Sequence, residues 1–521
     1  MRLYSASAMR EIDRRAIQEM GVPSLALMEN AAAAVVAVLR EEFPSLPGGR
    51  AAVLCGKGNN GGDGFAVARL LREAGGAPEV FLFAGGEALA GDAALQLEKA
   101  RSAGVPVVPV AGTEGMAAVR AALDGAGLAV DALLGTGTRG AVSGLLAEAI
   151  AALNAGCSTV VSLDVPSGLS GDRCAPHGPA VRAALTVTLG FAKPVLFTPE
   201  GEPFAGKVVV ADIGLPPRAS EGVAPLGEAL GEVWARPLFP ARGPLAHKGG
   251  CGRVLIVAGS AGKAGAALLA ARGALRAGAG LVTVAAPAPL LPALAGGLPE
   301  AMALPLPATV EGTASMDGLT PVLALARECD AVGMGPGLGT FAETAALARE
   351  LYAALPVPAV ADADALNAFA GAEGQLSRHA APRVLTPHPG EMGRLLGLPA
   401  SEVLASRYES VPEKARAWGA ALLLKGHRTL VSDGAGPWRL NLSGGPHMAA
   451  PGMGDVLTGV VAALLARGFS PLDAASLGAW WHGAAADAAF EKLGGYGILA
   501  SEVADALPKI EGRLRGQNAR A

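Results

Sequence analysis

The 521-residue sequence has few aromatic side chains and no excess of positive charge. Phenylalanine, tryptophan and tyrosine together make up 4% of it, and 42 basic residues stand against 46 acidic ones, for a net charge of −4. Proteins that bind nucleic acid usually carry a basic surface, and those that bind single strands stack bases on aromatic rings. The composition therefore argues against a nucleic-acid partner.

Cysteine is also scarce. The five cysteines are widely scattered and contain no C-x-x-C pair. Their odd number and wide spacing argue against a disulfide framework and against a structural zinc site, so a reducing cytoplasm is expected. The first 20 residues are charged throughout, which is not typical of a secretory signal.

Long hydrophobic runs are missing as well. The longest apolar region, residues 281–310, is interrupted by six prolines. A bilayer span needs about 20 unbroken apolar residues, so we expect no membrane segment. Hydrophobic residues nevertheless make up 51% of the chain, which is enough for sizeable cores. At roughly 100–200 residues per domain, two large domains are expected.

Short apolar runs alternate with glycine-rich turns and Ala/Leu-rich segments along the whole chain, with no tandem repeat. This alternation predicts βαβ units, parallel sheets and an α/β fold. The proline- and glycine-rich stretch 212–246 is interpreted as the connection between two such domains, with a short helix around residues 226–234. The expected strands of the two series are residues 51–54, 80–83, 107–110, 128–134 and 159–163, then 254–257, 281–285, 331–334, 359–361, 384–385 and 422–424.

The first glycine-rich turn, GKGNNGGDG at residues 56–64, follows a predicted strand and opens a predicted helix. Glycines there let the backbone approach a phosphate, and free N–H groups at the helix start favour an anion. The G-x-G-x-x-G spacing alone is a weak signal, because a tight strand–helix turn has it too. Two asparagines and an aspartate supply more oxygens than a phosphate cradle needs.

Two further polar turns follow predicted strands, at Asp131 and at Asp164. Ligands of open α/β sheets bind beyond the carboxyl ends of the strands, so all three turns are expected to converge on one pocket. The oxygens of Asn60, Asp131 and Ser167 are then suited to hold a hard cation. Each aspartate taken singly fits an Asx turn or a helix N-cap equally well.

These strings resemble the NAD(P)H-hydrate epimerase domain over about residues 1–215. The motifs that support this resemblance are GKGNNGGDG, DALLGTGTRG, DVPSGLSGD and the LMENAA run at 27–32. The resemblance implies a Rossmann-like domain that interconverts the R and S forms of hydrated NADH and NADPH at C6 of the nicotinamide ring.

The same resemblance implies roles for individual residues. Asn60, Asp131 and Ser167 match potassium ligands, and Asp164 is the candidate acid/base, because epimerising a carbinolamine carbon needs proton transfers. Lys193 is a candidate to assist; a snorkelled surface lysine is the alternative. The positions that match contacts to the hydrated nucleotide are Asn59, Asn60, Gly61, Gly62, Asp63, Gly135, Thr136, Gly137, Thr138, Arg139, Gly140, Ala141 and Asp164.

The second half carries its own glycine-rich strings. GMGD at 452–455 opens a predicted helix, and GMGPGLG at 333–339, TPHPGE at 386–391 and KGHRT at 425–429 follow predicted strands. Glycine amides at a helix N-terminus form an anion site, and an adjacent aspartate can accept a hydroxyl proton. This arrangement suits phosphoryl transfer to an alcohol, although a plain helix cap has it too.

These strings resemble the ribokinase-like fold, and within it the NAD(P)H-hydrate dehydratase domain, over about residues 225–510. HKGGCGRVLIVAGS, VADADALNAF and KGHRTLVSDG also match that pattern. The resemblance implies that a nucleotide, expected to be ADP with Mg²⁺, phosphorylates the ring hydroxyl of the S hydrate and that elimination restores NAD(P)H, with Asp455 as the base.

The resemblance again assigns positions. Ala266, Gly337, His388 and Asp455 match contacts to the hydrated nucleotide. The matches to adenine-nucleotide contacts are Lys425, Gly426, His427, Arg428, Thr429 and Gly454. With both halves together, the expected partners are hydrated NADH or NADPH and ADP, and a homo-oligomer is expected.

The chain departs from the family pattern before Asp455. Gly445-Pro446-His447 stands where Asn-Pro-Gly is more usual, and Ala450–Gly454 where Thr-Gly-Gly-Thr-Gly is frequent. Lys263 replaces a common aromatic. Two other functions compete: a small-molecule kinase with a regulatory Rossmann-like module, which fits the helix start equally well, and a non-catalytic scaffold. TPHPGE and KGHRT favour repair over the kinase, and the intact Asp/Asn clusters disfavour a scaffold.

Overall fold

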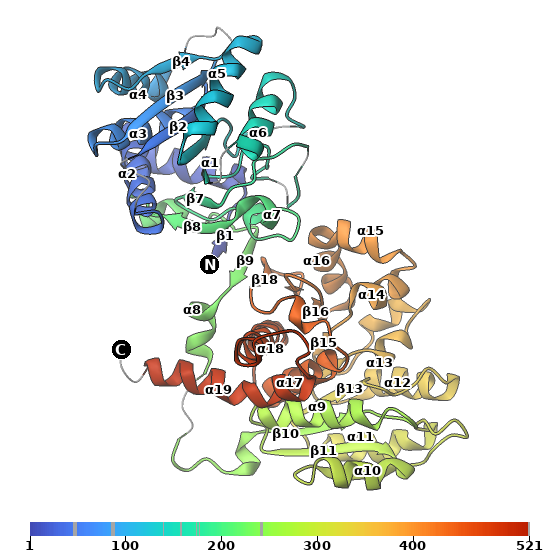
Figure 1. Cartoon of the computed structure of the whole chain (residues 1–521). Coiled ribbons are helices and arrows are strands. Elements are labelled where there is room, and N and C mark those ends of the chain that lie inside the picture. Colours follow the sequence, from blue (N-terminus) through green and yellow to red (C-terminus); the bar gives the residue numbers. More distant parts are fainter. Residues whose placement is uncertain are drawn as a thin grey trace. The chain divides into compact units, whose positions relative to one another are not determined.

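The computed structural model describes residues 1–44, 49–84, 89–138, 140–156, 159–172, 174–176, 178–239 and 243–518. It divides into two compact units, Met1–Glu228 and Ala229–Ala521. Each unit is an α/β structure with its own core (Figure 1), which confirms the predicted fold class. Among the described residues no helix is long and apolar enough to cross a membrane.

The first unit is built on a parallel sheet with the strand order β4-β3-β2-β5-β6-β7-β8. Its strands are apolar on both faces, as expected for a sheet that helices cover on both sides. Their bounds are Arg50–Gly56 (β2), Ala77–Phe83 (β3), Val107–Pro109 (β4), Leu128–Ala132 (β5), Val160–Leu163 (β6), Leu185–Leu189 (β7) and Lys207–Ala211 (β8).

Helices cover both faces of this sheet. Side chains of α2, α3 and α4 pack with Val53 and Val80 on one face, and those of α5 and α6 pack with Leu54 and Phe81 on the other. Successive strand residues point to opposite faces, so one strand serves both cores. The helices are Ser24–Glu42 (α2), Asn59–Glu73 (α3), Gly91–Ser102 (α4), Gly112–Gly125 (α5), Gly144–Gly156 (α6) and the short Glu202–Ala205 (α7).

The N-terminal segment packs against the end of this sheet. Strand β1 (Arg2–Leu3) pairs with the start of β9 (Gly227–Leu230), and helix α1 (Ala6–Arg14) follows, with Ser5 as its N-cap. Tyr4 donates its backbone N–H to the Ala192 carbonyl oxygen at 2.9 Å, and its ring meets Phe191 edge-on. These contacts hold α1 beside the loop that follows β7.

The second unit is built on a sheet with the order β18-β17-β16-β15-β14-β13-β10-β11-β12, parallel from β16 to β12. Strands β17 and β18 extend it as antiparallel neighbours. The bounds are Arg253–Val257 (β10), Leu281–Pro287 (β11), Met302–Leu306 (β12), Ala331–Met334 (β13), Ala359–Ala361 (β14), Arg383–Leu385 (β15), Ala421–Leu424 (β16), Leu430–Ser432 (β17) and Trp438–Asn441 (β18).

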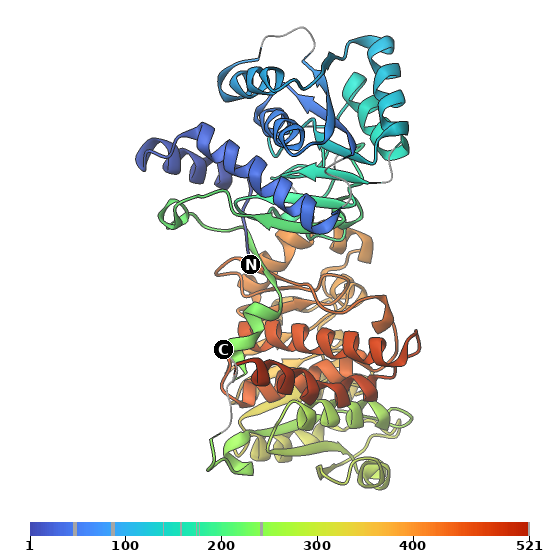
Figure 2. The same ribbon diagram turned by 60° about the vertical axis from the view of Figure 1, so that its left-hand side comes forward.

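The main core of the second unit lies between this sheet and helices α9, α17, α18 and α19, which run side by side (Figure 2). Glycine lets two of these helices touch: a Cβ on Gly459 of α17 would lie 1.9 Å from the Ala270 carbonyl oxygen of α9. The helices are Glu232–Ala235 (α8), Ala264–Arg276 (α9), Leu291–Gly297 (α10), Leu319–Ala326 (α11), Ala342–Ala354 (α12), Asp364–Asn367 (α13), Pro389–Leu396 (α14), Ala400–Ala405 (α15), Arg407–Trp418 (α16), Met453–Ala466 (α17), Pro471–Leu493 (α18) and Ala500–Asn518 (α19).

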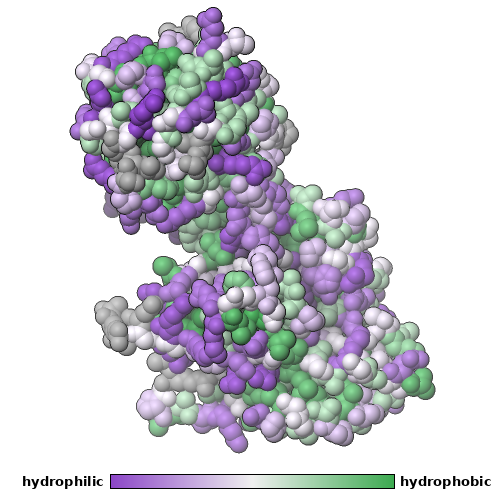
Figure 3. All heavy atoms as spheres, viewed as in Figure 1, coloured by the Kyte–Doolittle hydropathy of each residue, from purple (hydrophilic) through white to green (hydrophobic). Residues whose placement is uncertain are grey.

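The structure differs from the sequence-based expectations near the connection. The helix predicted around residues 226–234 is wrong: residues 227–230 form β9, and only Glu232–Ala235 is helical. A strand forms here instead of a helix because the backbone of Gly227 and Glu228 pairs with β1. Strands β7 and β8 were missed, although Leu185–Leu189 alternates Leu, Val and Thr as a buried strand does. In the view of Figure 3, hydrophilic side chains are spread over the surface of both units.

Candidate functional sites

Each sheet reverses its strand order at one point. In the first unit, β3 and β4 lie to one side of β2 while β5 to β8 lie to the other; in the second, β11 and β12 lie to one side of β10 while β13 to β18 lie to the other. Such a switch point opens a crevice outside the carboxyl ends of the strands, and ligands bind there. The predicted site residues of each half follow these strand ends.

The glycine-rich turn of the first unit runs directly into α3, whose first turn holds Asn59, Asn60 and Asp63. A Cβ on Gly61 would lie 1.9 Å from the Gly56 carbonyl oxygen, and one on Gly56 would lie 2.0 Å from the Leu133 carbonyl oxygen. The turn therefore packs backbone against backbone. Only glycine permits so close an approach.

Asp131 and Ser167 form the buried floor of this site. The Asp131 carboxylate accepts hydrogen bonds from the hydroxyl of Ser162 at 2.8 Å, from the backbone N–H of Ser167 at 2.8 Å and from its hydroxyl at 2.5 Å. Burial raises the pKa of Asp131, and these donors oppose the rise. Asn60 donates to the Leu134 carbonyl oxygen at 2.9 Å, but its own buried Oδ1 has no hydrogen-bond partner among the described residues.

Asp164 and Lys193 form an ion pair at the ends of β6 and β7. The Lys193 side chain is 1% exposed and donates to the Asp164 carboxylate, to the Leu189 carbonyl oxygen at 2.9 Å and to the Thr188 hydroxyl at 3.2 Å. The same carboxylate accepts the Leu189 backbone N–H at 3.1 Å. Burial of this depth shows that Lys193 is not a solvated surface lysine.

Two more carboxyl groups lie near this pair. Asp63, on α3, is 8% exposed, and burial together with the nearby Asp164 and Asp13 raises its pKa well above the usual value. Asp13, on α1, was not singled out from the sequence. Burial raises its pKa too, with Asp164 adding to the rise and Lys193 opposing it.

The loop after β5 carries the other predicted nucleotide contacts. Gly135, Thr136, Gly137 and Thr138 follow the strand directly, and the Thr138 hydroxyl donates to the Gly135 carbonyl oxygen at 2.9 Å. Gly140 and Ala141 come next, whereas Arg139 lies outside the described residues. A Cβ on Gly171 would lie 2.9 Å from Thr136 and 3.1 Å from Ala6, so Gly171 lies between this loop and the start of α1.

In the second unit, Asp455 lies in the first turn of α17. Gly452 caps this helix with φ +85°, a left-handed conformation suited to glycine. Burial and the negative charge of Asp362 raise the pKa of Asp455 to about 7; Asp364 and Glu391 add to the rise, and Lys425 opposes it. A carboxyl with such a pKa is divided between its acid and base forms near neutral pH.

Lys425 is the cation of this second cluster. Its ammonium group lies 2.7 Å from Asp362 Oδ1 and 3.6 Å from Glu391 Oε2. Burial opposes its charge, but these two carboxylates outweigh burial and raise the pKa of Lys425. The Thr458 hydroxyl, one turn along α17 from Gly454, donates to Asp362 Oδ2 at 2.9 Å. A Cβ on Gly454 would lie 3.3 Å from the ammonium nitrogen, so Gly454 lies against Lys425.

The remaining predicted residues surround this cluster. His388 caps α14: its Nδ1 accepts the backbone N–H groups of Gly390 at 3.0 Å and Glu391 at 3.3 Å, leaving a half-exposed ring. Ala266, in α9, and Gly337 are neighbours, because a Cβ on Gly337 would lie 3.0 Å from that of Ala266. After β16, the Thr429 hydroxyl donates to the Gly426 carbonyl oxygen at 3.0 Å, and exposed His427 lies between them.

Backbone strain marks both sites. Among the described residues, the non-glycine residues with φ in the left-handed region are Asp164 (+64°), Ala363 (+50°) and Arg428 (+57°). Asp164 belongs to the first site, and Ala363 and Arg428 belong to the loops that carry Asp362 and Lys425. Such conformations cost about 1–3 kcal/mol each and gather where a side chain must be held in place for a function.

Sequence reasoning overlooked several members of these clusters. Asp362 and Asp364 directly follow β14, so the strand-end rule that found Asp131 applies to them equally. Glu391 and Thr458 lie within motifs that were recognised, but their side chains were not singled out. His482 of α18 is buried, and burial together with the nearby Lys425 lowers its pKa to about 4. It carried no sequence signal, because it lies inside an Ala-rich helix.

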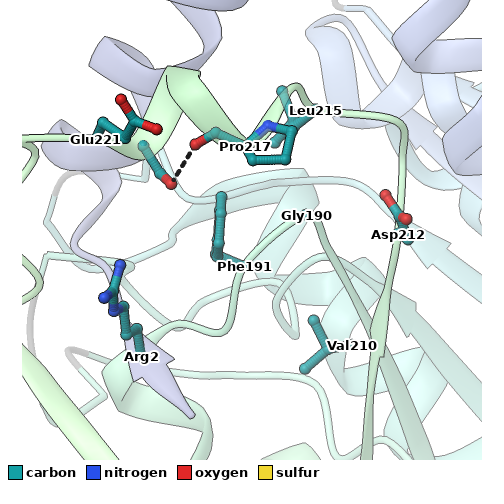
Figure 4. A pocket seen from close by; sticks show the side chains of 9 residues that line it. Arg2, Gly190, Phe191, Val210, Asp212, Leu215, Pro217 and Glu221 are labelled. Atoms are coloured by element: carbon teal, nitrogen blue, oxygen red, sulfur yellow. Dashed lines mark hydrogen bonds between the residues drawn. The ribbon is translucent and has the colours of Figure 1, made fainter.

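A separate hollow of about 500 Å³ lies in the first unit beside β1 and the ends of β7 and β8 (Figure 4). Phe191 and Leu215 line its apolar part, while Arg2, Asp212 and Glu221 stand at its rim. None of the predicted site residues lines it. It is therefore distinct from the strand-end clusters described above.

Two family profiles match the chain. The YjeF-related protein N-terminus matches residues 24–195, and NAD(P)H-hydrate dehydratase matches residues 254–509. The bifunctional NAD(P)H-hydrate repair enzyme Nnr of Moorella thermoacetica is 42% identical over 511 residues, covering 98% of this chain and 96% of that one. The chain belongs to the family of bifunctional NAD(P)H-hydrate repair enzymes. The Escherichia coli member is 35% identical, covering 98% and 93% of the two chains.

Solved structures resemble about half of this chain. The ADP/ATP-dependent NAD(P)H-hydrate dehydratase of Bacillus subtilis, co-crystallised with ATP and Mg²⁺, is 29% identical, covers 55% of this chain and 99% of its own, and has a TM-score of 0.46. A ribokinase-like superfamily protein of Enterococcus faecalis is 26% identical, covers 55% and 96%, and has a TM-score of 0.47. The family profiles and the full-length relatives confirm the prediction of a repair enzyme with epimerase and dehydratase domains.

Proposed function

We propose that this chain repairs hydrated NADH and NADPH in two steps: the first unit interconverts the R and S hydrates, and the second dehydrates the S hydrate with a nucleotide. The observation that carries the proposal is that the relatives match both units in one chain, and each unit holds a carboxylate–lysine ion pair beyond the carboxyl ends of its parallel strands. Because an epimerase in the same chain converts the R hydrate into the S hydrate, one stereospecific dehydratase can repair both.

The epimerase site is assigned to the strand-end cluster of the first unit. C6 of the hydrate carries a hydroxyl group and is bonded to N1, so inverting C6 requires a bond to break and re-form with proton transfer. The Asp164 carboxylate, held by Lys193, is the base. The first turn of α3, including Asn59, and the loop at residues 135–141 bind the nucleotide, because backbone N–H groups at a helix start suit phosphate.

The residues of the first unit fit a potassium ion. The buried Oδ1 of Asn60 has no hydrogen-bond partner among the described residues, and the Ser167 hydroxyl lies next to the Leu134 carbonyl that Asn60 contacts. Neutral oxygens of this kind, with one carboxylate, suit a hard cation. Asn60, Asp131 and Ser167 would hold the ion, and Asp131 also accepts the hydrogen bonds that fix Ser167. Bound there, potassium would supply positive charge near the nucleotide phosphates.

The dehydratase site is assigned to the Asp455 cluster. Asp455 takes the proton of the C6 hydroxyl as that oxygen attacks the terminal phosphoryl group of the nucleotide. The N-terminal amides of α17 and Lys425 stabilise the negative charge that develops. Loss of phosphate from C6 and of a proton from C5 then restores the ring double bond of NAD(P)H.

ADP is proposed as the phosphoryl donor, giving AMP and phosphate. Lys425, Gly426, Arg428 and Thr429 form its side of the site, next to Gly454. The carboxylates of Asp362 and Glu391 are oxygen donors of the type that Mg²⁺ takes, and Mg²⁺ would neutralise phosphate charge when bound with the nucleotide. We infer a reducing compartment, consistent with the free thiols of Cys55, Cys251 and Cys329, and a homo-oligomeric state.

Separate assays of the two steps test the proposal. Without nucleotide, the full chain should interconvert purified R and S hydrates, which chromatography resolves. With ADP and Mg²⁺, purified S hydrate should regain the absorbance of reduced nicotinamide, with one AMP and one phosphate per turnover. A folded preparation that does neither would refute the proposal, and sedimentation at several protein concentrations tests the oligomer.

A further inference from the structure

Three carboxyl groups and one ammonium group lie within electrostatic reach of one another in the first unit. Asp13 comes from α1, Asp63 from α3, Asp164 from the loop after β6 and Lys193 from the loop after β7. Four separate elements thus bring these side chains together. A single lysine cannot neutralise three carboxylates, so the hydrogen-bond donors and the burial of each carboxyl group decide whether that group is charged.

The hydrogen bonds are divided unequally among the three. Asp164 accepts hydrogen bonds from the Lys193 ammonium group and from the Leu189 backbone N–H, and both donors stabilise a negative charge. Within the described part of the chain, neither Asp63 nor Asp13 has a hydrogen-bond donor. Asp63 is more than nine-tenths buried, whereas Asp13 is partly exposed, so that solvent can stabilise its negative charge. A buried carboxyl without a donor or an adjacent cation is more stable with its proton.

The remaining neighbours of Asp63 do not change this conclusion. The Cys55 thiol of β2 is fully buried and carries no charge, because burial raises the pKa of the thiol. Asp13 and Asp164 disfavour a negative charge on Asp63, and Lys193, which favours it, is already committed to Asp164. Asp63 and Asp164 are therefore a neutral acid and a charged base in one site.

We propose that Asp63 is the general acid of the epimerisation and that Asp13 is a positioning residue, which keeps the proton on Asp63 by its negative charge. This inference rests on the proposed epimerase activity and adds to it. Asp13 reaches the site because Tyr4 and Ala6 anchor α1 to the loops at Ala192 and Gly171. The N-terminal helix thereby takes part in the chemistry.

The step balances without a further reactant. The N1 electron pair forms a π bond to C6 while the C6–O bond breaks, and the hydroxyl leaves as water with the proton of Asp63. The negative charges of Asp63 and Asp164 stabilise the resulting ring cation. A water molecule then adds to the opposite face of C6 and loses a proton to Asp164, from which a proton returns to Asp63 through solvent.

Epimerisation by the full chain without nucleotide, measured across pH, tests the proposal. D63N should lower the rate at least about 100-fold, as expected for loss of a general acid. D13N removes a negative charge next to Asp63, so Asp63 should lose its proton at lower pH and the alkaline limb should move down by roughly half a pH unit or more. D13E keeps the charge and should restore the wild-type profile, and exposed Asp212→Asn should leave it unchanged.

The outcomes separate this inference from the proposed function. A wild-type chain that does not interconvert the hydrates refutes the epimerase itself. A wild-type chain that does, together with a D13N profile that superimposes on it or a D63N rate within tenfold of it, overturns only the roles of Asp13 and Asp63. In H₂¹⁸O, each inversion should place one labelled oxygen on C6; retention of the original oxygen would overturn the step. Thermal unfolding verifies that each variant is folded.

Discussion

Lys425 and Asp362 form an ion pair with 2.7 Å between Nζ and Oδ1, and this pair lies beside the start of α17. Lys425 is paired with Asp362 and Glu391. The negative charge of Asp362 therefore affects the pKa of Asp455 more than the positive charge of Lys425 does. The proposed base therefore has a pKa of about 7 instead of a value near 4. The ion pair also explains why the partly buried Lys425 keeps its charge at the nucleotide side of the site.

The dehydratase is expected to gain activity as pH rises through about 7. Asp455 acts as a base only when ionised, and its pKa of about 7 puts the ionised fraction near one tenth at about pH 6. Values of kcat/KM for purified S hydrate with ADP, measured from pH 5.5 to 8.5, should follow this titration. A rate that is flat over this range would contradict the role of Asp455.

Replacing Asp362 should move that titration. D362N removes the carboxylate that, after burial, raises the pKa of Asp455 most, and it leaves Lys425 freer to stabilise the Asp455 anion. Both effects lower the pKa of Asp455, so the acid limb of the dehydratase profile should shift to lower pH by roughly one unit. The exposed Asp317→Asn is the matched control. An unshifted limb in D362N would show that the cluster does not set this pKa.

Replacing Lys193 should remove the first activity alone. K193M leaves the Asp164 carboxylate without its cation, so the epimerase rate should fall at least about 100-fold while dehydration of purified S hydrate stays at the wild-type rate. Breaking a mostly buried ion pair should also lower the free energy of unfolding of the first unit by about 3 kcal/mol. Lys207, whose side chain is 60% exposed, supplies the control K207M. An unaffected K193M epimerase would remove Lys193 from the site.

Potassium should stabilise and activate the first unit. If Asn60 and Ser167 hold the ion, the unfolding temperature of this unit should rise with KCl more than with an equal concentration of choline chloride, because a ligand of the native state stabilises it. The epimerase rate should rise over the same concentrations. N60A should abolish both responses and leave the dehydratase intact. Equal responses of the wild type to the two salts would contradict the assignment.

In the glycine-rich turn at residues 56–64, glycine should be required at Gly61 but not at Gly58. A Cβ at Gly61 would lie 1.9 Å from a backbone oxygen, whereas one at Gly58 would meet no atom within 4 Å. G61A should therefore destabilise the first unit by about 2–4 kcal/mol, and G58A by less than about 1 kcal/mol. Chemical denaturation measures both. Equal stabilities would mean that the turn is not packed as described.

The strand-end rule accounts for much of what could be predicted from the sequence. Parallel strands end at the same edge, so the turns at Asp131 and Asp164 were expected to meet, and the structure places both beside the first turn of α3. The rule had no means of finding Asp13, because this residue lies on an N-terminal helix that reads as a charged surface helix. Only the packing of Tyr4 and Ala6 brings it into the site.

The helix predicted around residues 226–234 is wrong because pairing with a distant strand overrides the local preference. Local propensity favours helix in this stretch, but Gly227 and Glu228 pair with β1, which lies more than 220 residues earlier in the chain. His388 shows a subtler limit. It stands in a Gly/Pro turn at a strand end, so the sequence favoured a pocket position, whereas its Nδ1 also caps α14.

Recovery of reduced-nicotinamide absorbance from a mixture of R and S hydrated NADH tests the central claim most directly, because it needs both units. With ADP, Mg²⁺ and K⁺, the account predicts full recovery by the wild type. It predicts recovery that stalls at the S share in K193M and none in Asp455→Asn. Recovery that stalls at the S share in the wild type would contradict the epimerase assignment. No recovery with ADP or ATP in a folded preparation would contradict the repair function.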